Sequence, residues 1–149
     1  MKICLFTYCG AIAALPVHCP TDLVFVLDES GSIGSTNFKL VKSFLSQLVS
    51  RLDIDSGSTR VGLVTYATRV GFTFNLNTHS TVSSIQAAIS SIQYSRGGTD
   101  TDAALAYVRT VMLRPAAGDR GDVPNIIAVI TDGKSNNRQA TQVFTTDVY

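Results

Sequence analysis

The chain has 149 residues, of which 45% are hydrophobic and 15% are charged, and its formal net charge is +1. This length suits one domain with its own core, and the hydrophobic content excludes an intrinsically disordered chain. The near-neutral charge, without a basic patch or an interleaved run of aromatic residues, argues against binding of nucleic acid.

The first residues of the chain have the pattern of a secretory signal peptide. Lys2 precedes an apolar stretch that ends in small residues, as such signals do. The stretch is too short, and too interrupted by polar residues, to span a membrane. We therefore expect residues 1–18 to be removed on secretion, with cleavage between Ala13 and Cys19. The alternative is that this stretch forms a buried first strand or helix.

Residues 22–34 combine a short apolar run with a polar turn. The run Leu23–Leu27 is rich in β-branched and aromatic residues, which predicts a strand buried on both faces, as in parallel sheets. The turn reads Asp-x-Ser-x-Ser, so Asp28, Ser30 and Ser32 leave the carboxyl end of the strand together. Ligands bind at that end of open α/β sheets, and these hard oxygen atoms suit Mg²⁺ or Mn²⁺ rather than zinc. The alternative is a polar turn without a ligand.

The next part of the chain predicts a helix and a pair of strands. Apolar residues at helical spacing predict a helix over residues 38–52, with candidate N-caps at 35–37. Residues 60–66 form a second strand, and residues 69–75 alternate well enough to form a third. Because the link 67–68 has the length of a hairpin turn, we expect the third strand to be antiparallel and to lie at an edge of the sheet.

Two more helices and a second buried strand follow. A cap at residues 80–81 precedes a helix over 82–92, and a further helix runs over 102–113. Residues 125–130 are apolar at nearly every position, which again predicts a buried strand. Residues 139–149 could begin another helix.

This order of elements predicts an α/β fold with a doubly wound, mostly parallel sheet and one antiparallel edge strand. If the second strand lies on one side of the first and the strand 125–130 lies on the other, a switch point falls beside the first strand. The Asp-x-Ser-x-Ser turn then lies next to Asp132, with the loop that carries Thr99 above it. The predicted strand order and the Asp-x-Ser-x-Ser motif therefore indicate the same position for a ligand site.

Three stretches in this order resemble the von Willebrand factor type A family, whose members include the integrin I-like domains and the A domains of matrilins and collagens. They are the Asp-x-Ser-x-Ser turn, residues 97–101 before a helix, and residues 129–133 at the end of a strand. The resemblance covers residues 20–149 and implies a Rossmann-like fold with a metal-ion-dependent adhesion site. The matching positions are Asp28, Ser30, Ser32, Thr99 and Asp132.

The resemblance implies a secreted module of the extracellular matrix that binds a protein ligand through Mg²⁺ or Mn²⁺. In similar domains an acidic side chain of the partner, which can be collagen or another matrix protein, completes the shell of the ion. A structural domain with an idle metal site is one alternative. A Mg²⁺-dependent enzyme is the other, and it is disfavoured because the chain has neither a Gly-x-x-x-x-Gly-Lys-Ser/Thr loop nor a nucleophile paired with a base.

The resemblance also implies that elements are missing after Tyr149, because similar domains continue through further strands and helices. We therefore expect residues 20–149 to form a partial domain in which the strand 125–130 keeps one bare, aggregation-prone edge. In similar domains a cysteine placed like Cys19 pairs with one after the last helix. This sequence has no such partner, so we expect Cys19 to form disulfides between molecules.

Several polar and aromatic residues are interpreted without a role in the site. Glu29 is expected to be exposed, and Tyr66 is expected to pack at the edge of the core. Asp100 and Asp102 are interpreted as residues that cap and favour the first turn of their helix, with positions near the ion as the alternative. The tripeptide Arg-Gly-Asp at 120–122, which many integrins recognise, is interpreted as a chance occurrence in a surface loop.

Overall fold

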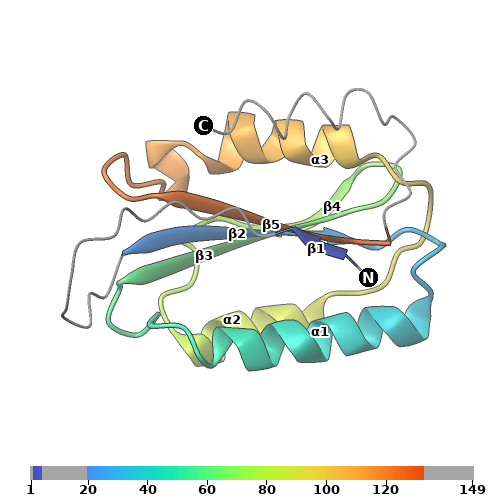
Figure 1. Cartoon of the computed structure of the whole chain (residues 1–149), viewed down its shortest axis with the longest axis horizontal. Helices are drawn as coiled ribbons and strands as arrows, with labels where there is room; N and C mark the ends of the chain where they lie inside the picture. Colours follow the sequence, from blue (N-terminus) through green and yellow to red (C-terminus); the bar gives the residue numbers. More distant parts are fainter. Residues whose placement is uncertain (1, 5–19, 133–149) are drawn as a thin grey trace.

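The computed structural model describes residues 2–4 and 20–132, in which helices lie on both sides of a central sheet (Figure 1). The sheet has five strands in the order β1-β5-β2-β3-β4. The strands are β1 (Lys2–Cys4), β2 (Thr21–Asp28), β3 (Thr59–Tyr66), β4 (Val70–Phe74) and β5 (Asn125–Thr131). β2 pairs in parallel with both β3 and β5, whereas β4 pairs antiparallel with β3. The predicted α/β class, the switch point beside β2 and the antiparallel edge strand are therefore confirmed.

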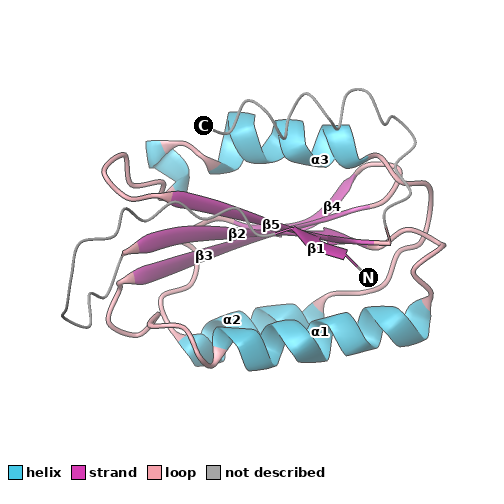
Figure 2. Ribbon diagram, in the orientation of Figure 1, coloured by secondary structure: helices cyan, strands magenta, loops and turns pink. Residues whose placement is uncertain are grey.

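The helices cover the two faces of the sheet unequally, as Figure 2 shows. They are α1 (Ser35–Val49), α2 (Val82–Ser91) and α3 (Thr101–Tyr107), which continues as a π-helical segment (Val108–Met112) before a 3₁₀ turn (Pro115–Ala117). α1 and α2 lie on one face, and α3 lies on the other (Figure 1). Each helix falls where the sequence predicts one. Within the described residues no helix has the length and apolar character that a membrane span needs.

Alternate side chains of β2 point to the two faces of the sheet. Leu23, Phe25 and Leu27 belong to the core beneath α1 and α2, whereas Val24 and Val26 belong to the core beneath α3. None of the five is more than 7% exposed. Because both faces are covered, the strand is apolar at every position instead of at alternate positions. The prediction of a strand buried on both faces is confirmed.

The helix starts that the sequence predicts are correct for α2 and α3 and wrong for α1. Thr81 caps α2 and Asp100 caps α3, each accepting a hydrogen bond from a backbone N–H three residues ahead. The N-cap of α1 is Gly34, which has no side chain to accept a bond, so the candidates at 35–37 are not caps. Gly34 has φ 76, a conformation that glycine adopts without steric cost, and the chain uses it to turn from the Asp-x-Ser-x-Ser motif into α1.

In the full chain the outer edge of β5 is paired at its carboxyl end, so the expectation of a bare edge is wrong for that part of the strand. Lys2–Cys4 (β1) pair antiparallel with Val129–Thr131 at the carboxyl end of β5. The reason is that a free edge can pair with any extended segment that reaches it, including one from before the first core strand. For residues 20–149 alone, which lack this segment, the bare edge stays a prediction. The rest of the predicted signal segment, Cys19 and the possible helix at 139–149 lie outside the described residues.

A buried ion pair fixes the loop that carries the Arg-Gly-Asp tripeptide. Asp22 is fully buried, and its two oxygens accept hydrogen bonds from the Nε and the backbone N–H of Arg120, both at 2.8 Å. The guanidinium also donates to three backbone carbonyls, those of Thr21, Gly57 and Ser58. The tripeptide does lie in a surface loop, but its arginine is bound within the fold and is not displayed to a partner.

Candidate metal centre

Asp28 ends β2 and is held from both sides. It is fully buried, its Oδ1 accepts a hydrogen bond from the backbone N–H of Ser30 at 2.8 Å, and its Oδ2 accepts one from the hydroxyl of Thr131 at 2.8 Å. The first bond comes from its own turn and the second from the end of β5. The carboxylate is therefore fixed at the switch point, where the chain also continues from Thr131 to Asp132.

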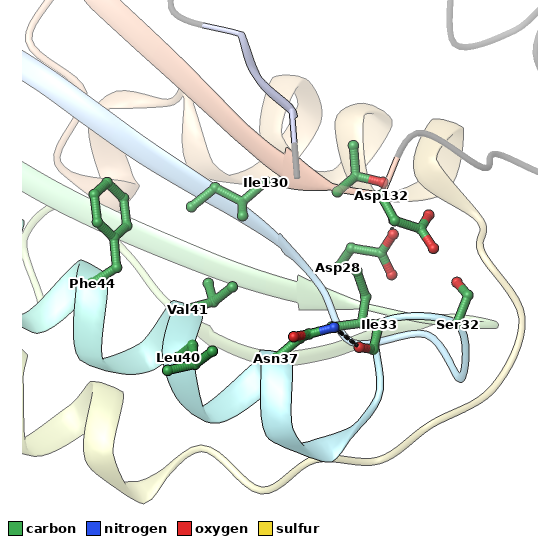
Figure 3. Close-up of a pocket in the computed structure, with 10 residues that line it drawn as sticks. Asp28, Ser32, Ile33, Asn37, Leu40, Val41, Phe44, Ile130 and Asp132 are labelled. Atoms are coloured by element: carbon green, nitrogen blue, oxygen red, sulfur yellow. Dashed lines mark hydrogen bonds between the residues drawn. The ribbon is translucent and has the colours of Figure 1, made fainter.

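The two serines of the motif place their hydroxyl groups side by side. The Oγ atoms of Ser30 and Ser32 are 3.1 Å apart, and Ser30 is buried whereas Ser32 is exposed. Figure 3 shows that the side chains of Asp28, Ser32 and Asp132 lie at the same end of the sheet. One hydroxyl is thus part of the buried framework, and the other lies at the surface.

A cavity of about 380 Å³ opens beside this group of oxygens, between α1 and the end of β5 (Figure 3). Asp28, Ser32 and Asp132 belong to its polar part, which also includes Asn37 and Thr131. Leu40 and Phe44 of α1 form part of its apolar wall. The two apolar side chains are 63% and 38% exposed, respectively. The oxygens therefore lie at the edge of a space that is open to a ligand.

Thr99 lies in the loop before α3, and a backbone bond connects this loop to the motif. The N–H of Gly31 donates to the carbonyl of Gly97 at 3.0 Å, and Thr99 itself is 6% exposed. In the described part of the chain, no hydrogen bond joins the Thr99 hydroxyl to the other predicted ligands. The structure thus brings the loop that carries Thr99 against the motif turn.

This set of donor groups fits a hard divalent cation. Two carboxylates and three hydroxyls offer only oxygen atoms, which are the ligands of Mg²⁺, Mn²⁺ and Ca²⁺. Among residues 2–4 and 20–132, no group of three or more His, Cys, Asp or Glu side chains could hold a metal ion. The described residues therefore offer no site of the structural zinc type, which needs thiolate or imidazole ligands.

Tyr66 lies next to this group, although the sequence assigned it only a packing role at the edge of the core. It is fully buried at the end of β3, opposite Asp28 in the strand register, and the hydroxyl of Thr101 donates to its Oη at 3.3 Å. Burial raises the pKa of Tyr66 to about 12; the bond from Thr101 opposes this rise, and the negative charge of Asp28 adds to it. The position of Tyr66 as the last residue of the neighbouring strand was the signal that could have identified it.

The high pKa of Tyr66 predicts that the metal-free domain loses stability in alkaline solution. An unfolded tyrosine ionises near pH 10, as it does in model peptides. Because the pKa of Tyr66 in the folded state is raised to about 12, its contribution to the free energy of unfolding is fully present below about pH 10. This contribution falls by about 2–3 kcal/mol as the pH rises to about 12. Urea unfolding across this range, with Tyr66→Phe as the control, measures the effect. An identical pH dependence in the Phe variant would contradict the assignment.

Tyr94 holds both ends of the turn that contains the motif. Its hydroxyl donates to the carbonyl of Ser30 at 2.8 Å and accepts a hydrogen bond from the N–H of Gly34 at 3.1 Å. Its ring packs against Phe38 of α1, with the ring centroids 5.0 Å apart. Tyr94 was not predicted from the sequence, because no local pattern relates it to a turn about sixty residues earlier. We infer that Tyr94 keeps the serine hydroxyls in place.

Replacing Tyr94 with phenylalanine is expected to lower the affinity for Mg²⁺ several-fold while the domain stays folded. The ring keeps its contact with Phe38, but the two hydrogen bonds that fix the turn are lost, at about 0.5–1.5 kcal/mol each. Calorimetric titration measures the affinity, and thermal unfolding measures the stability. Tyr107→Phe, which removes a hydroxyl from α3, is the matched control. A lower melting temperature with unchanged affinity would mean that the hydroxyl serves stability alone.

Glu29 is buried, so the expectation of an exposed loop residue was wrong. It is 2% exposed, and its Oε1 accepts a hydrogen bond from the hydroxyl of Thr65 at 3.1 Å. Successive side chains of an extended segment point in opposite directions, and this turns Glu29 away from the side of Asp28 and toward β3 and β4. Gly71 of β4 leaves the space that the carboxylate fills, because a side chain there would collide with it.

Comparison with known sequences identifies the family. The model of the von Willebrand factor type A domain matches residues 22–146. The collagen alpha-4(VI) chain of Mus musculus is 41% identical over 120 residues, which are 79% of this chain and 5% of the collagen. Matrilin-1 of Mus musculus is 42% identical over 118 residues, which are 77% of this chain and 24% of the matrilin. The chain thus spans no more than about a quarter of the length of either relative.

Comparison with solved structures agrees with the family assigned from the sequences. Proximal thread matrix protein 1 from the mussel byssus superimposes with a TM-score of 0.79 at 26% identity, covering 87% of this chain and 35% of that protein. The same mussel protein has also been solved with a zinc-occupied metal-ion-dependent adhesion site. These relatives are proteins of the extracellular matrix, which confirms the location that the sequence predicts. Motif, fold and relatives agree: the chain belongs to the von Willebrand factor type A domain family.

Proposed function

We propose that this chain is an adhesion module of the extracellular matrix that binds a protein ligand through a divalent cation. The observation that carries the proposal is that three separate segments meet at the carboxyl end of β2. The motif turn supplies paired hydroxyls, the end of β5 fixes the first carboxylate, and the loop before α3 is bonded to the turn. The residues that would hold the cation are Asp28, Ser30, Ser32, Thr99 and Asp132.

Mg²⁺ or Mn²⁺ is the cation that these donor groups fit best. Only two of the five groups are charged, so a bound ion would keep part of its positive charge and act as the attachment point for an anionic group. The hydrogen bonds from Ser30 and Thr131 keep the Asp28 carboxylate in place before any ion arrives. The zinc-occupied site of the mussel protein supports a divalent ion at the same motif.

The partner is a matrix protein, with collagen as one candidate, that offers an aspartate or glutamate side chain. Ser32 lies at the surface beside the open cavity, which gives such a side chain a way to reach the ion. The relationship to collagen and matrilin supports a binding role and not an enzymatic one. The second candidate is a structural domain with an idle metal site. It is distinguished from an adhesion module by the absence of ligand binding.

Capture of matrix proteins by the immobilised chain in Mg²⁺ and in EDTA tests the proposal. We expect an acidic ligand to bind in Mg²⁺ or Mn²⁺ and to be released by EDTA. Its binding should weaken strongly when its glutamate is changed to glutamine, because a neutral amide binds a cation poorly. A chain with Asp132→Ala is the control for metal binding at other places. Equal capture with and without metal would exclude the ion-bridged mechanism.

We also propose that residues 1–18 are a signal peptide and that residues 20–149 carry the type A domain. Secretion would then remove β1 and free the end of β5 with which it pairs. Sequencing the amino terminus of secreted protein tests this assignment, and an intact Met1 would contradict it.

A further inference from the structure

A second cavity lies next to the motif turn, beside β4. It has a volume of about 560 Å³ and lies between the start of β4, the turn 67–69 and the segment after α2. Glu29 is part of its lining, whereas the preceding residue, Asp28, lines the cavity at the metal centre. The two cavities therefore flank one turn of the chain, and we call the second one the arginine cavity.

Two exposed arginines line the arginine cavity. Arg69 and Arg96 are exposed, and within the described residues neither forms an ion pair. The one carboxylate in the lining belongs to Glu29, which is 2% exposed and accepts its hydrogen bond from Thr65. The cavity thus offers two exposed guanidinium groups, whereas its one carboxylate is buried and hydrogen-bonded.

The backbone around Arg96 is held in an unfavourable conformation. Arg96 has φ 64 and is the one non-glycine residue with positive φ in the described chain. Its guanidinium carbon lies 5.8 Å from the centroid of the Tyr94 ring, a cation–π contact. The chain is bonded to the motif turn on both sides of Arg96, through the hydroxyl of Tyr94 two residues before it and the carbonyl of Gly97 directly after it. Strain that persists at such a place is typical of functional sites.

The wall that carries Arg69 is equally fixed. The hydroxyl of Thr68 accepts a hydrogen bond from the N–H of Gly98 at 2.9 Å, which ties the β3–β4 turn to the loop before α3. The pairing of β3 with β4 is irregular next to this turn, where the hydroxyl of Thr65 accepts a bond from the N–H of Phe72 at 2.8 Å. Such bulges redirect side chains near binding sites. Both arginines therefore stand on segments held in place before a ligand arrives.

We propose that the arginine cavity binds a second acidic side chain of the peptide segment whose first acidic side chain binds the cation, an inference that rests on the proposed function. Guanidinium groups form charge-assisted hydrogen bonds with carboxylates in a planar, paired geometry. Gly97 is bonded to the motif turn and Gly98 to Thr68 in the lining of the arginine cavity, so the loop that connects the two sites has no side chain at these positions. Binding at one site raises the effective concentration of the second acidic group at the other.

Two kinds of synthetic peptide test this inference with the full chain in Mg²⁺. One-acid peptides carry a single glutamate among glycine and serine residues, and two-acid peptides carry a second glutamate after spacers of increasing length. We expect the best two-acid peptide to bind about tenfold more tightly by fluorescence anisotropy, a modest part of what linked sites can supply. In the double variant Arg69→Gln/Arg96→Gln the gain should vanish, while the affinity of the one-acid peptide should stay unchanged.

The matched control is the double variant Arg51→Gln/Arg114→Gln, which removes the same charge from two exposed arginines outside both cavities. The gain should persist in this control. Equal affinities for all peptides, or a gain that survives Arg69→Gln/Arg96→Gln, would overturn the inference. If EDTA leaves binding of the one-acid peptide intact, the ion-bridged function fails. Whether the gain of the two-acid peptide is lost in Arg69→Gln/Arg96→Gln then still shows whether the arginine cavity binds an acidic side chain. If no peptide binds, both proposals fail.

Discussion

Replacing Asp132 with alanine is expected to abolish binding of Mg²⁺ to this chain. Asp28 and Asp132 supply the negative charge of the proposed ligand set, and the remaining groups are neutral hydroxyls. Asp132 is only partly buried, so its removal should cost little stability in the absence of metal. Calorimetric titration should show binding heat for the wild-type chain and none for the variant.

Thermal unfolding gives a second measurement of the same loss. A ligand present at a hundredfold excess over its dissociation constant stabilises the folded state by about 2.7 kcal/mol. The wild-type chain should therefore melt at a higher temperature in Mg²⁺, whereas Asp132→Ala should not. Asp122→Ala is the control, because Asp122 is an exposed acidic residue in the loop before β5 and outside the metal-site cavity. Unaltered Mg²⁺ binding by Asp132→Ala would show that the ion binds elsewhere.

Replacing Arg120 with alanine is expected to destabilise the domain by about 3–5 kcal/mol, because it leaves a buried charge without its partner. The carboxylate of Asp22 has no exposed surface, and it would lose the guanidinium and the hydrogen bond from Nε while keeping only the bond from the backbone N–H. Three backbone carbonyls would also lose a donor. Small domains are stable by about 5–15 kcal/mol, so this loss is a large share of the total. Urea unfolding measures it.

Two further variants separate the ion pair from other effects of the substitution. Arg114→Ala removes an exposed arginine from the same connection and should change stability by no more than about 0.5 kcal/mol. The double variant Asp22→Asn/Arg120→Met removes both charges and should recover part of the stability, because no charge is then left unpaired. A loss of less than about 1 kcal/mol in Arg120→Ala would mean that the pair behaves like an exposed salt bridge.

Local patterns were sufficient for the elements of this fold and for the positions of the candidate ligands. The run Leu23–Leu27 has no polar residue because both faces of β2 are covered, and that is visible without coordinates. The spacing within Asp-x-Ser-x-Ser, and the place of Asp132 after a second buried strand, are likewise properties of short segments. The strand order follows from these elements, since each parallel crossover restricts which neighbours a strand can have.

The contacts that support the site depend on residues far apart in the sequence. Tyr94 bonds to Ser30 across 64 positions, and Arg120 bonds to Asp22 across 98. Neither pair has a spacing that a periodic pattern can reveal. The pairing of Lys2–Cys4 with β5 is of the same kind, and it was missed because the segment was assigned to a signal peptide.

The sequence by itself determined the α/β class, the order of helices and core strands, and the meeting of the Asp-x-Ser-x-Ser turn with the end of β5. Tertiary structure alone decided that Glu29 is buried and that Tyr94 holds the motif turn. It also decided that the arginine of the Arg-Gly-Asp tripeptide belongs to the fold. The physical reason is that hydrophobic periodicity reports which face of an element is buried, whereas the partner of a polar group depends on how separate elements meet.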